Sequence, residues 1–510
     1  MRHLAFVGAA SAALLLSSPA FAEVLYRVTP AADGSKLAVE IEVPVKDPTV
    51  AIQVPSWSPG AYAMGNYWRS IQDLNASDEK GASLSVTHPK DDTWEVTAGG
   101  AKRVKFTYTV PIGGGRGGMG GSFDGKVLHW GGPPVYAYVL GRKEESCRLE
   151  LSLPTGWNTA IGLLSARSGG LAAYQAKNYD VLADNPVTVG DFTSETYTMR
   201  GKEHQLNFRG PARDTTDRAK AKKLCQFVTN SASDFFGGVP YDKYVFHFMM
   251  TQGPDGAGGL EHASSAQMFA MNGLGPRSVY GICHEYFHLW NVKRIRSAPL
   301  GPFDYTQLPK TGALWWLEGV TDYYAHVIPY RYGGVTREQF LAVTALQIDT
   351  IRKNPARLEV SPYDSSYRVA EAVGSFSSGY RVNYYPTGYI LGLLLDIELR
   401  AHTQGKRSLD DVEKALWKLC QNDKPGFAED EIRKQLIKFG GEEMGPIYDT
   451  LVMKPGEFPY DSILAKAGLE LVPGERLGMR EKPDATEEQK VIREGLLKSR
   501  PMVNLFAQDK

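Results

Sequence analysis

His284-Glu285-Tyr286-Phe287-His288, an HExxH pentapeptide, is the most informative stretch of this 510-residue sequence. Two histidines four residues apart on a helix lie on the same face, about one turn apart, so both imidazoles can bind one metal ion. Glu285 lies between them, and its carboxylate can take a proton from a water that the metal activates. The pentapeptide therefore predicts a zinc-hydrolase site in which His284 and His288 bind the metal and Glu285 is the general base.

A third metal ligand is expected downstream, because catalytic zinc sites usually have three protein ligands. Glu318 stands inside a largely apolar helical run, where a carboxylate is costly unless it meets a cation. Asp322 follows four residues later on the same face, where it can accept the outer N–H of a metal-bound histidine and fix its tautomer. We therefore expect one zinc ion held by His284, His288 and Glu318 with Asp322 in support, although Mn or Co also binds such a donor set.

The length of the chain implies two or three domains. From residue 23 to about 195, apolar and polar residues alternate with period two between Pro and Gly turns, as in residues 37–43. This pattern is typical of half-buried antiparallel strands and predicts a β-sandwich-like domain over residues 23–200.

After residue 210 the apolar spacing becomes helical, with one strand at 244–250. We expect a helix-rich α+β catalytic domain, with its zinc-binding half in residues 201–330 and a helical continuation in residues 331–472. The helices are expected at 219–236, 278–292, 314–326, 337–354, 387–402 and 409–419.

The first 22 residues have the pattern of a signal peptide: Arg2 and His3, then an apolar run, then the small residues of 20–22. We expect an exported protein, periplasmic or secreted, with no membrane span. Lys and Arg number 57, as do Asp and Glu, so the formal net charge is zero. This balance argues against nucleic acid or an anionic membrane surface as a partner.

Four cysteines follow the signal peptide, which is too few for a disulfide scaffold in a chain of this size. The sequence does not choose a pairing among them. Cys283 adjoins His284, and we expect it to be a small apolar residue on the buried side of the metal helix rather than a ligand. The four are Cys147, Cys225, Cys283 and Cys420.

The pentapeptide belongs to a set of longer distinctive stretches. Around it they are HEYFHLWNVKRIR (284–296), GPFDY (301–305) and LWWLEGVTDYY (314–324), and elsewhere VPSWSPGAY (54–62), YDVLADNP (179–186), GGLEH (258–262) and SLDDV (408–412). Together they resemble the glycyl aminopeptidase family of gluzincin zinc metallopeptidases, over nearly the whole chain to about residue 472. The resemblance implies a thermolysin-like catalytic domain that removes small amino-terminal residues, Gly and Ala preferred, from peptides.

The GGLEH stretch stands where related aminopeptidases carry a Gly-x-Met-Glu-Asn motif on an edge strand. The resemblance implies that Glu261 pairs with the free ammonium of the substrate and that the backbone of Gly258 and Gly259 aligns the peptide. A charge-assisted contact of this kind favours a chain terminus over an internal peptide bond.

The oxyanion donor of aminopeptidase relatives is the tyrosine of a Tyr-x-Lys-Gly sequence. Residues 385–388 of this chain read YPTG, so the resemblance implies that Tyr385 has this role, with Thr in place of Lys. Tyr380, Tyr384 and Tyr389 lie close by along the chain and stay open as alternatives.

Members of this family usually continue into a PDZ-like module. Residues 473–510 are charged and have only a weak helical pattern at 487–497, so we expect no complete PDZ domain there. Two other functions compete with the aminopeptidase reading: a zinc endopeptidase of the same fold, and a non-catalytic exported peptide-binding protein. An endopeptidase would leave Glu261 without a purpose, and a purely structural zinc site would not need Glu285.

Overall fold

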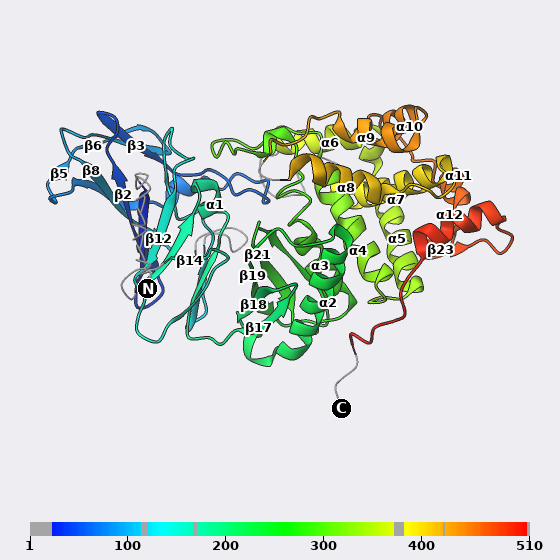
Figure 1. Cartoon of the computed structure of the whole chain (residues 1–510), viewed down its shortest axis with the longest axis horizontal. Helices are drawn as coiled ribbons and strands as arrows, with labels where there is room; N and C mark the ends of the chain where they lie inside the picture. The colour runs from blue at the N-terminus through cyan, green and yellow to red at the C-terminus, as the bar shows by residue number, and fades with distance from the viewer. Residues whose placement is uncertain (1–22, 114–120, 167–170, 372–381, 422–423, 507–510) are drawn as a thin grey trace, which may run out of the picture.

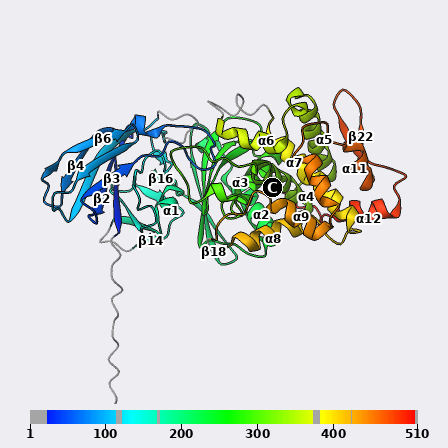
Figure 2. The ribbon, with the colours of Figure 1, turned by 90° about the horizontal axis from the view of Figure 1, so that it is seen from above.

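The computed structural model describes residues 23–113, 121–166, 171–371, 382–421 and 424–506, in a β-rich part and a helix-rich part (Figure 1). The two parts lie end to end along the long axis, and the view from above shows the same arrangement (Figure 2). The expected signal peptide, residues 1–22, lies outside the described residues. Among the residues that are described, no helix has the length and apolar composition that a bilayer crossing requires.

The β-rich part consists of three sheets, and its two longest described strands alternate between buried and more exposed residues, as the sequence pattern predicts. The largest has the order β14-β15-β12-β1-β2-β8-β4-β5, and the others are β13-β16-β10-β9 and β11-β3-β7-β6. Their apolar faces enclose one hydrophobic core. The strands are β1 (Val24–Pro30), β2 (Lys36–Pro44), β3 (Thr49–Gln53), β4 (Gln72–Asp78), β5 (Ser83–Leu84), β6 (Val86–Lys90), β7 (Thr93–Thr97), β8 (Arg103–Pro111), β9 (Ser122–Phe123), β10 (Val127–Trp130), β11 (Tyr138–Val139), β12 (Cys147–Leu151), β13 (Asn158–Ala160), β14 (Ser165–Ala166), β15 (Ala172–Ala176) and β16 (Val187–Gly190).

One strand pair departs from the antiparallel pattern. β1 runs parallel to β12, with Val24 opposite Cys147 and Val28 opposite Leu151. Period-two alternation is the same in both kinds of pairing, so the sequence pattern does not distinguish them.

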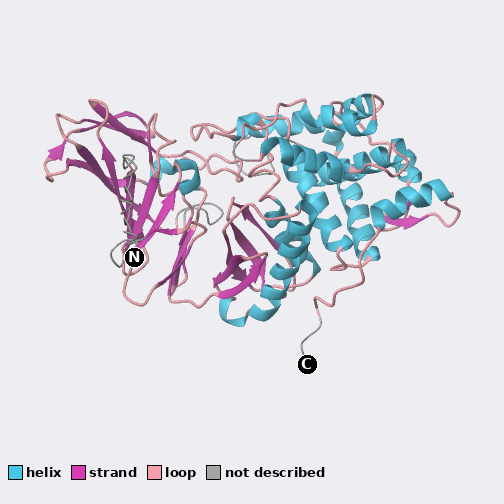
Figure 3. Ribbon diagram, in the orientation of Figure 1, coloured by secondary structure: helices cyan, strands magenta, loops and turns pink. Residues whose placement is uncertain are grey.

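The second part is built on a five-stranded sheet that α2 (Arg218–Phe236) and α3 (Pro276–Phe287) cover (Figure 3). The sheet has the order β17-β18-β19-β21-β20, so β20 is an edge strand. The domain boundary that we expect after residue 200 falls in the turn between two paired strands of this sheet, and it stays a prediction. The strands are β17 (Glu195–Met199), β18 (Lys202–Arg209), β19 (Lys243–Thr251), β20 (Ala257–Glu261) and β21 (Ser265–Met271).

Helices make up most of the chain after residue 276, which confirms the expected order of a sheet-rich domain followed by a helix-rich one. Glu318 lies in a short π-helical segment, η5 (Trp315–Val320), that leads directly into α4 (Thr321–Arg331). The other helices are α5 (Arg337–Arg352), α6 (Pro362–Tyr367), α7 (Tyr384–His402), α8 (Leu409–Cys420), α9 (Glu431–Gly440), α10 (Met444–Leu451), α11 (Tyr460–Lys466) and α12 (Glu487–Leu497), and a small β22 (Leu469–Val472) and β23 (Gly478–Glu481) hairpin precedes α12.

The metal helix ends earlier than its apolar spacing predicts. We expect it to run to residue 292, whereas α3 ends at Phe287 and the chain then turns. Val292 has a φ of 118°, which no helix contains, so the apolar Leu289, Trp290 and Val292 pack in the core through a turn.

Two glycines allow η5 and α7 to cross at close range. A Cβ added to Gly319 would lie 2.3 Å from the carbonyl oxygen of Tyr384, and one added to Gly388 would lie 1.9 Å from that of Trp315. Only residues without a side chain fit at this crossing. The crossing brings the start of α7 against the segment that carries Glu318.

Replacing Gly388 by Ala is expected to lower the free energy of unfolding by about 2 kcal/mol or more, because overpacking outweighs the roughly 1 kcal/mol that Ala gains over Gly in a helix. Chemical denaturation measures this change. Gly495→Ala in α12 is the control, because the added Cβ would meet only the flexible end of Arg400. Equal stability of the two variants would contradict a close crossing.

Candidate metal centre and active site

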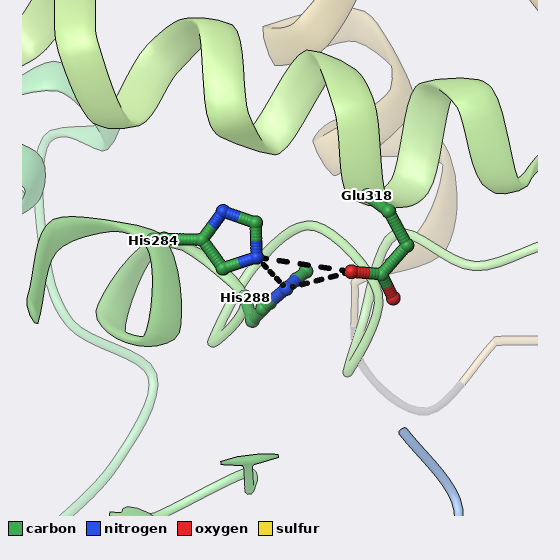
Figure 4. Close-up of side chains that lie close together, drawn as sticks. All are labelled: His284, His288 and Glu318. Carbon is green, nitrogen blue, oxygen red and sulfur yellow. Dashed lines mark hydrogen bonds and ion pairs between the residues drawn. The ribbon is translucent and has the colours of Figure 1, made fainter. Parts of the chain in front are cut away.

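Three side chains from two segments of the helix-rich part converge on one point (Figure 4). His284 and His288 project from the end of α3, and their Nε2 atoms lie 2.9 Å apart. Glu318 reaches them from η5, with Oε2 3.2 Å from Nε2 of His288 and 3.8 Å from Nε2 of His284. The structure thus brings together the three residues expected as metal ligands.

The spacing of these atoms fits a single tetrahedral ion. Ligand atoms bound to zinc at about 2.0–2.1 Å are separated by about 3.3 Å in tetrahedral geometry, and the three distances here lie on either side of that value. Glu318 is only 2% exposed. Burial opposes its ionisation, but His288 and His284 hold its pKa below its usual range, so that it is a carboxylate at neutral pH. Two imidazoles and one carboxylate are a donor set that zinc accepts.

Both histidines are oriented through their outer nitrogens. Asp322, one turn beyond Glu318, has Oδ1 3.4 Å from Nδ1 of His284. On the other side, Nδ1 of His288 donates to the backbone carbonyl of Asn291 over 2.7 Å. Each contact keeps Nε2 turned toward the metal position.

Asn291 is a residue that the sequence pattern does not reveal. Its carbonyl reaches His288 because the chain leaves the helix after Phe287 and turns back. Its side-chain amide donates to the carbonyl of Trp316 and to the hydroxyl of Thr321, over 3.1 and 3.0 Å. The turn after the metal helix is therefore tied to the segment that carries Glu318.

Glu285 lies in the same centre, 5% exposed. A carboxylate oxygen of Glu285, one of Glu261 and a ring nitrogen of His288 all lie within 4.8 Å of one another. Burial raises the pKa of Glu285 to about 7, with the Glu261 and Glu318 charges adding to the rise and the two histidines opposing it. A carboxylate of this kind can both accept and return a proton near neutral pH.

The GGLEH stretch forms the edge strand beside this centre. Gly258 pairs with Phe269 and Gly259 with Met268 of β21, which leaves the outer edge of β20 unpaired among the described strands. A Cβ on Gly259 would lie 3.0 Å from Cγ of Glu285, so the strand runs directly against that side chain. Glu261 at its end is 4% exposed.

A buried ion pair between the two parts of the molecule holds the end of this strand. Asp184, just after α1 (Tyr179–Ala183), lies 2.6 Å from Nζ of Lys293 and 3.0 Å from Nδ1 of His262. Burial would raise the pKa of Asp184, but Lys293 and His262 hold it well below its usual range. His262 therefore has a structural partner.

Tyr385 stands in the first turn of α7, with its ring centroid 5.8 Å from that of His284. Burial and the charge of Glu318 raise its pKa, so its hydroxyl keeps its proton. Tyr389 instead bonds to Thr344 over 2.8 Å, and the Tyr384 ring packs on that of Tyr385. Tyr380 lies outside the described residues.

The fold and this site define a class of protein: a metallopeptidase in which HExxH and a glutamate on a second helical segment meet beside an edge strand. The sequence matches the profile of the peptidase M61 N-terminal domain over residues 26–191, and that of the M61 glycyl aminopeptidase over residues 278–391. These matches together span more than half of the chain, which belongs to the M61 glycyl aminopeptidase family. The family resemblance and the enzyme class expected from the sequence are confirmed.

Several solved structures share this fold. An aminopeptidase N family protein from Idiomarina loihiensis is 21% identical, with a TM-score of 0.79 over 88% of this chain and 79% of that chain. An M1 zinc metallopeptidase from Deinococcus radiodurans is 13% identical, with a TM-score of 0.55 over 86% and 95%. Yeast LTA4 hydrolase in complex with bestatin is 13% identical, with a TM-score of 0.55 over 86% and 68%. These three structures confirm the expected thermolysin-like fold. A search of curated proteins found no match.

Replacing Asp322 by Asn is expected to weaken zinc binding by about 10- to 100-fold, because His284 loses its anionic partner. Competition with a chromogenic chelator measures the affinity. The control is Glu413→Gln, which changes a fully buried carboxyl that is not bonded to either histidine, one whose pKa burial raises to about 8. If both variants bind zinc equally well, Asp322 does not support His284.

Proposed function

We propose that this protein is an exported zinc aminopeptidase that holds one zinc ion with His284, His288 and Glu318 and removes small amino-terminal residues, preferably Gly and Ala, from peptides. One observation carries the proposal: the Glu261 carboxylate, on an edge strand, lies within 4.8 Å of ligand atoms of Glu285 and His288. An ammonium bound to Glu261 puts the first peptide bond next to the metal position. Export rests on the pattern of residues 1–22, and the preference for Gly and Ala on the family.

The reaction needs a Lewis acid, a base and a donor to the developing oxyanion. Zinc, when bound, supplies the Lewis acidity that acidifies water and polarises the substrate carbonyl. Glu285 accepts the proton of the attacking water and passes it to the leaving amine, for which its position and raised pKa suit it. Tyr385 donates its hydroxyl hydrogen to the oxyanion.

Substrate orientation comes from strand β20. The backbone of Gly258 and Gly259, at an edge with no partner among the described strands, aligns the peptide as an added strand. Glu261 ends the binding site by pairing with the free ammonium. An internal peptide segment would leave this buried carboxylate without a cation, which disfavours endopeptidase action.

Replacing Glu285 by Gln is expected to lower kcat by at least about 100-fold, because proton transfer by a positioned base contributes that much or more. Zinc content, measured by elemental analysis, should stay at one ion per chain. Unchanged peptidase activity in a variant that binds zinc normally would refute the role of Glu285, and would favour a site in which the metal is only structural.

The aminopeptidase assignment predicts that an amino-terminally acetylated peptide is not cleaved, whereas its free counterpart is. Glu261→Gln is expected to lower kcat/KM on the free peptide by about 10- to 100-fold, which corresponds to the loss of a hydrogen bond to a charged group. Liquid chromatography of the products measures both rates. Equal cleavage of the two peptides would identify an endopeptidase instead.

A further inference from the structure

A loop of the β-rich part reaches the active site. Tyr62, in the VPSWSPGAY stretch, is 5% exposed and packs in the hydrophobic core of the helix-rich part, not in that of its own sheets. Burial raises the pKa of Tyr62, and the charges of Glu318 and Glu261 raise it further. Tyr62 and Glu261 also line the same cavity, so the loop brings this side chain to the anchor carboxylate.

The loop approaches Glu261 so closely that it has no room for a side chain. Gly60 has a φ of 93°, and a Cβ there would lie 2.6 and 2.7 Å from the two carboxylate oxygens of Glu261. Glycine satisfies both constraints at once. The backbone at Gly60 thus covers the carboxylate expected to bind the ammonium of the substrate.

Contacts with residues 303–305 hold this loop in place. The backbone N–H of Ser56 donates to the carbonyl of Tyr305, and the indole N–H of Trp57 to that of Asp304, both over 2.8 Å. The Trp57 ring meets Phe303 edge to face, with centroids 6.0 Å apart. These contacts fix the position of the loop, which is therefore a structural part of the active site.

Two residues with strained backbone conformations lie next to Glu261. Tyr62 has a φ of 42° and Val292 a φ of 118°, values that aromatic and β-branched residues rarely adopt. Both residues line one small cavity, together with Gly60, Glu261 and Lys293. Strained residues of this kind cluster where a ligand is held.

The position of Tyr62 corresponds to the first side chain of a substrate. With the ammonium on Glu261 and the scissile carbonyl at the metal position, the Cα of the first residue lies next to Glu261. A substituent on that carbon extends from beside this carboxylate. Tyr62 and Glu261 line the same cavity, so the Tyr62 side chain lies on the path of such a substituent.

We propose that Tyr62 limits the size of the first residue of the substrate, so that glycyl and alanyl peptides bind and those with larger side chains are excluded. This inference rests on the proposed function, because it requires that Glu261 binds the amino group. The ring, and not the hydroxyl, sets the limit. The β-rich part therefore contributes a specificity-determining residue to a site whose chemistry lies wholly in the helix-rich part.

The test compares Tyr62→Ala with Tyr62→Phe on glycyl, alanyl, valyl and leucyl anilides. In Tyr62→Ala, the kcat/KM for the leucyl substrate divided by that for the glycyl substrate is expected to rise at least tenfold. In Tyr62→Phe, which keeps the ring, the ratio is expected to stay within about twofold of the wild-type value. Competitive inhibition by glycine and leucine hydroxamates gives the same comparison without a chemical step.

Zinc content and thermal unfolding identify a variant that is not folded, and Tyr62→Leu then replaces Tyr62→Ala with the same expectation. An unchanged ratio in a folded variant overturns the inference, and so does an equal rise in Tyr62→Phe. A wild-type enzyme that cleaves none of the free anilides overturns the proposed function and this inference together. Cleavage of the glycyl substrate with no effect of Tyr62 overturns the inference alone.

Discussion

The meeting of the buried Glu318 carboxylate with His284 and His288 is the constraint on which the rest of the structure depends. A carboxylate that is 2% exposed needs cationic partners, and the two imidazoles, with the ion they are suited to hold, provide them. The three ligand atoms must keep their spacing to within a few tenths of an ångström. Two segments that are separated along the chain must therefore be fixed against each other with that precision.

Several features of the helix-rich part serve this alignment. Asn291 ties the turn after α3 to Trp316 and Thr321, and its carbonyl orients His288. Gly319 and Gly388 let α7 approach η5 closely, which places Tyr385 near His284. The π-helical turn at Glu318 belongs with these features, because such turns occur often at functional sites. Polar contacts and close packing together hold the arrangement.

The β-rich part takes a direct part in the active site. Asp184 pairs with Lys293 at the interface, and the loop at residues 56–62 covers Glu261. The distinctive stretches at 54–62, 179–186 and 301–305 contain no residue of the proposed chemistry. The contacts of these stretches give a physical reason for their distinctive residues. They hold the two parts of the molecule together around the edge strand where the substrate is expected.

The sequence by itself determined the features that depend on neighbours along the chain. Period-two alternation indicated the strands, helical spacing indicated most helices to within a few residues, and a four-residue interval placed His284 and His288 on one face. Sequence patterns did not reveal the parallel pairing of β1 with β12, the early end of α3, the role of the Asn291 carbonyl or the reach of Tyr62 across the interface. Only the tertiary structure decided these, because each depends on contacts with residues distant in sequence or on a backbone turn that side-chain periodicity does not record.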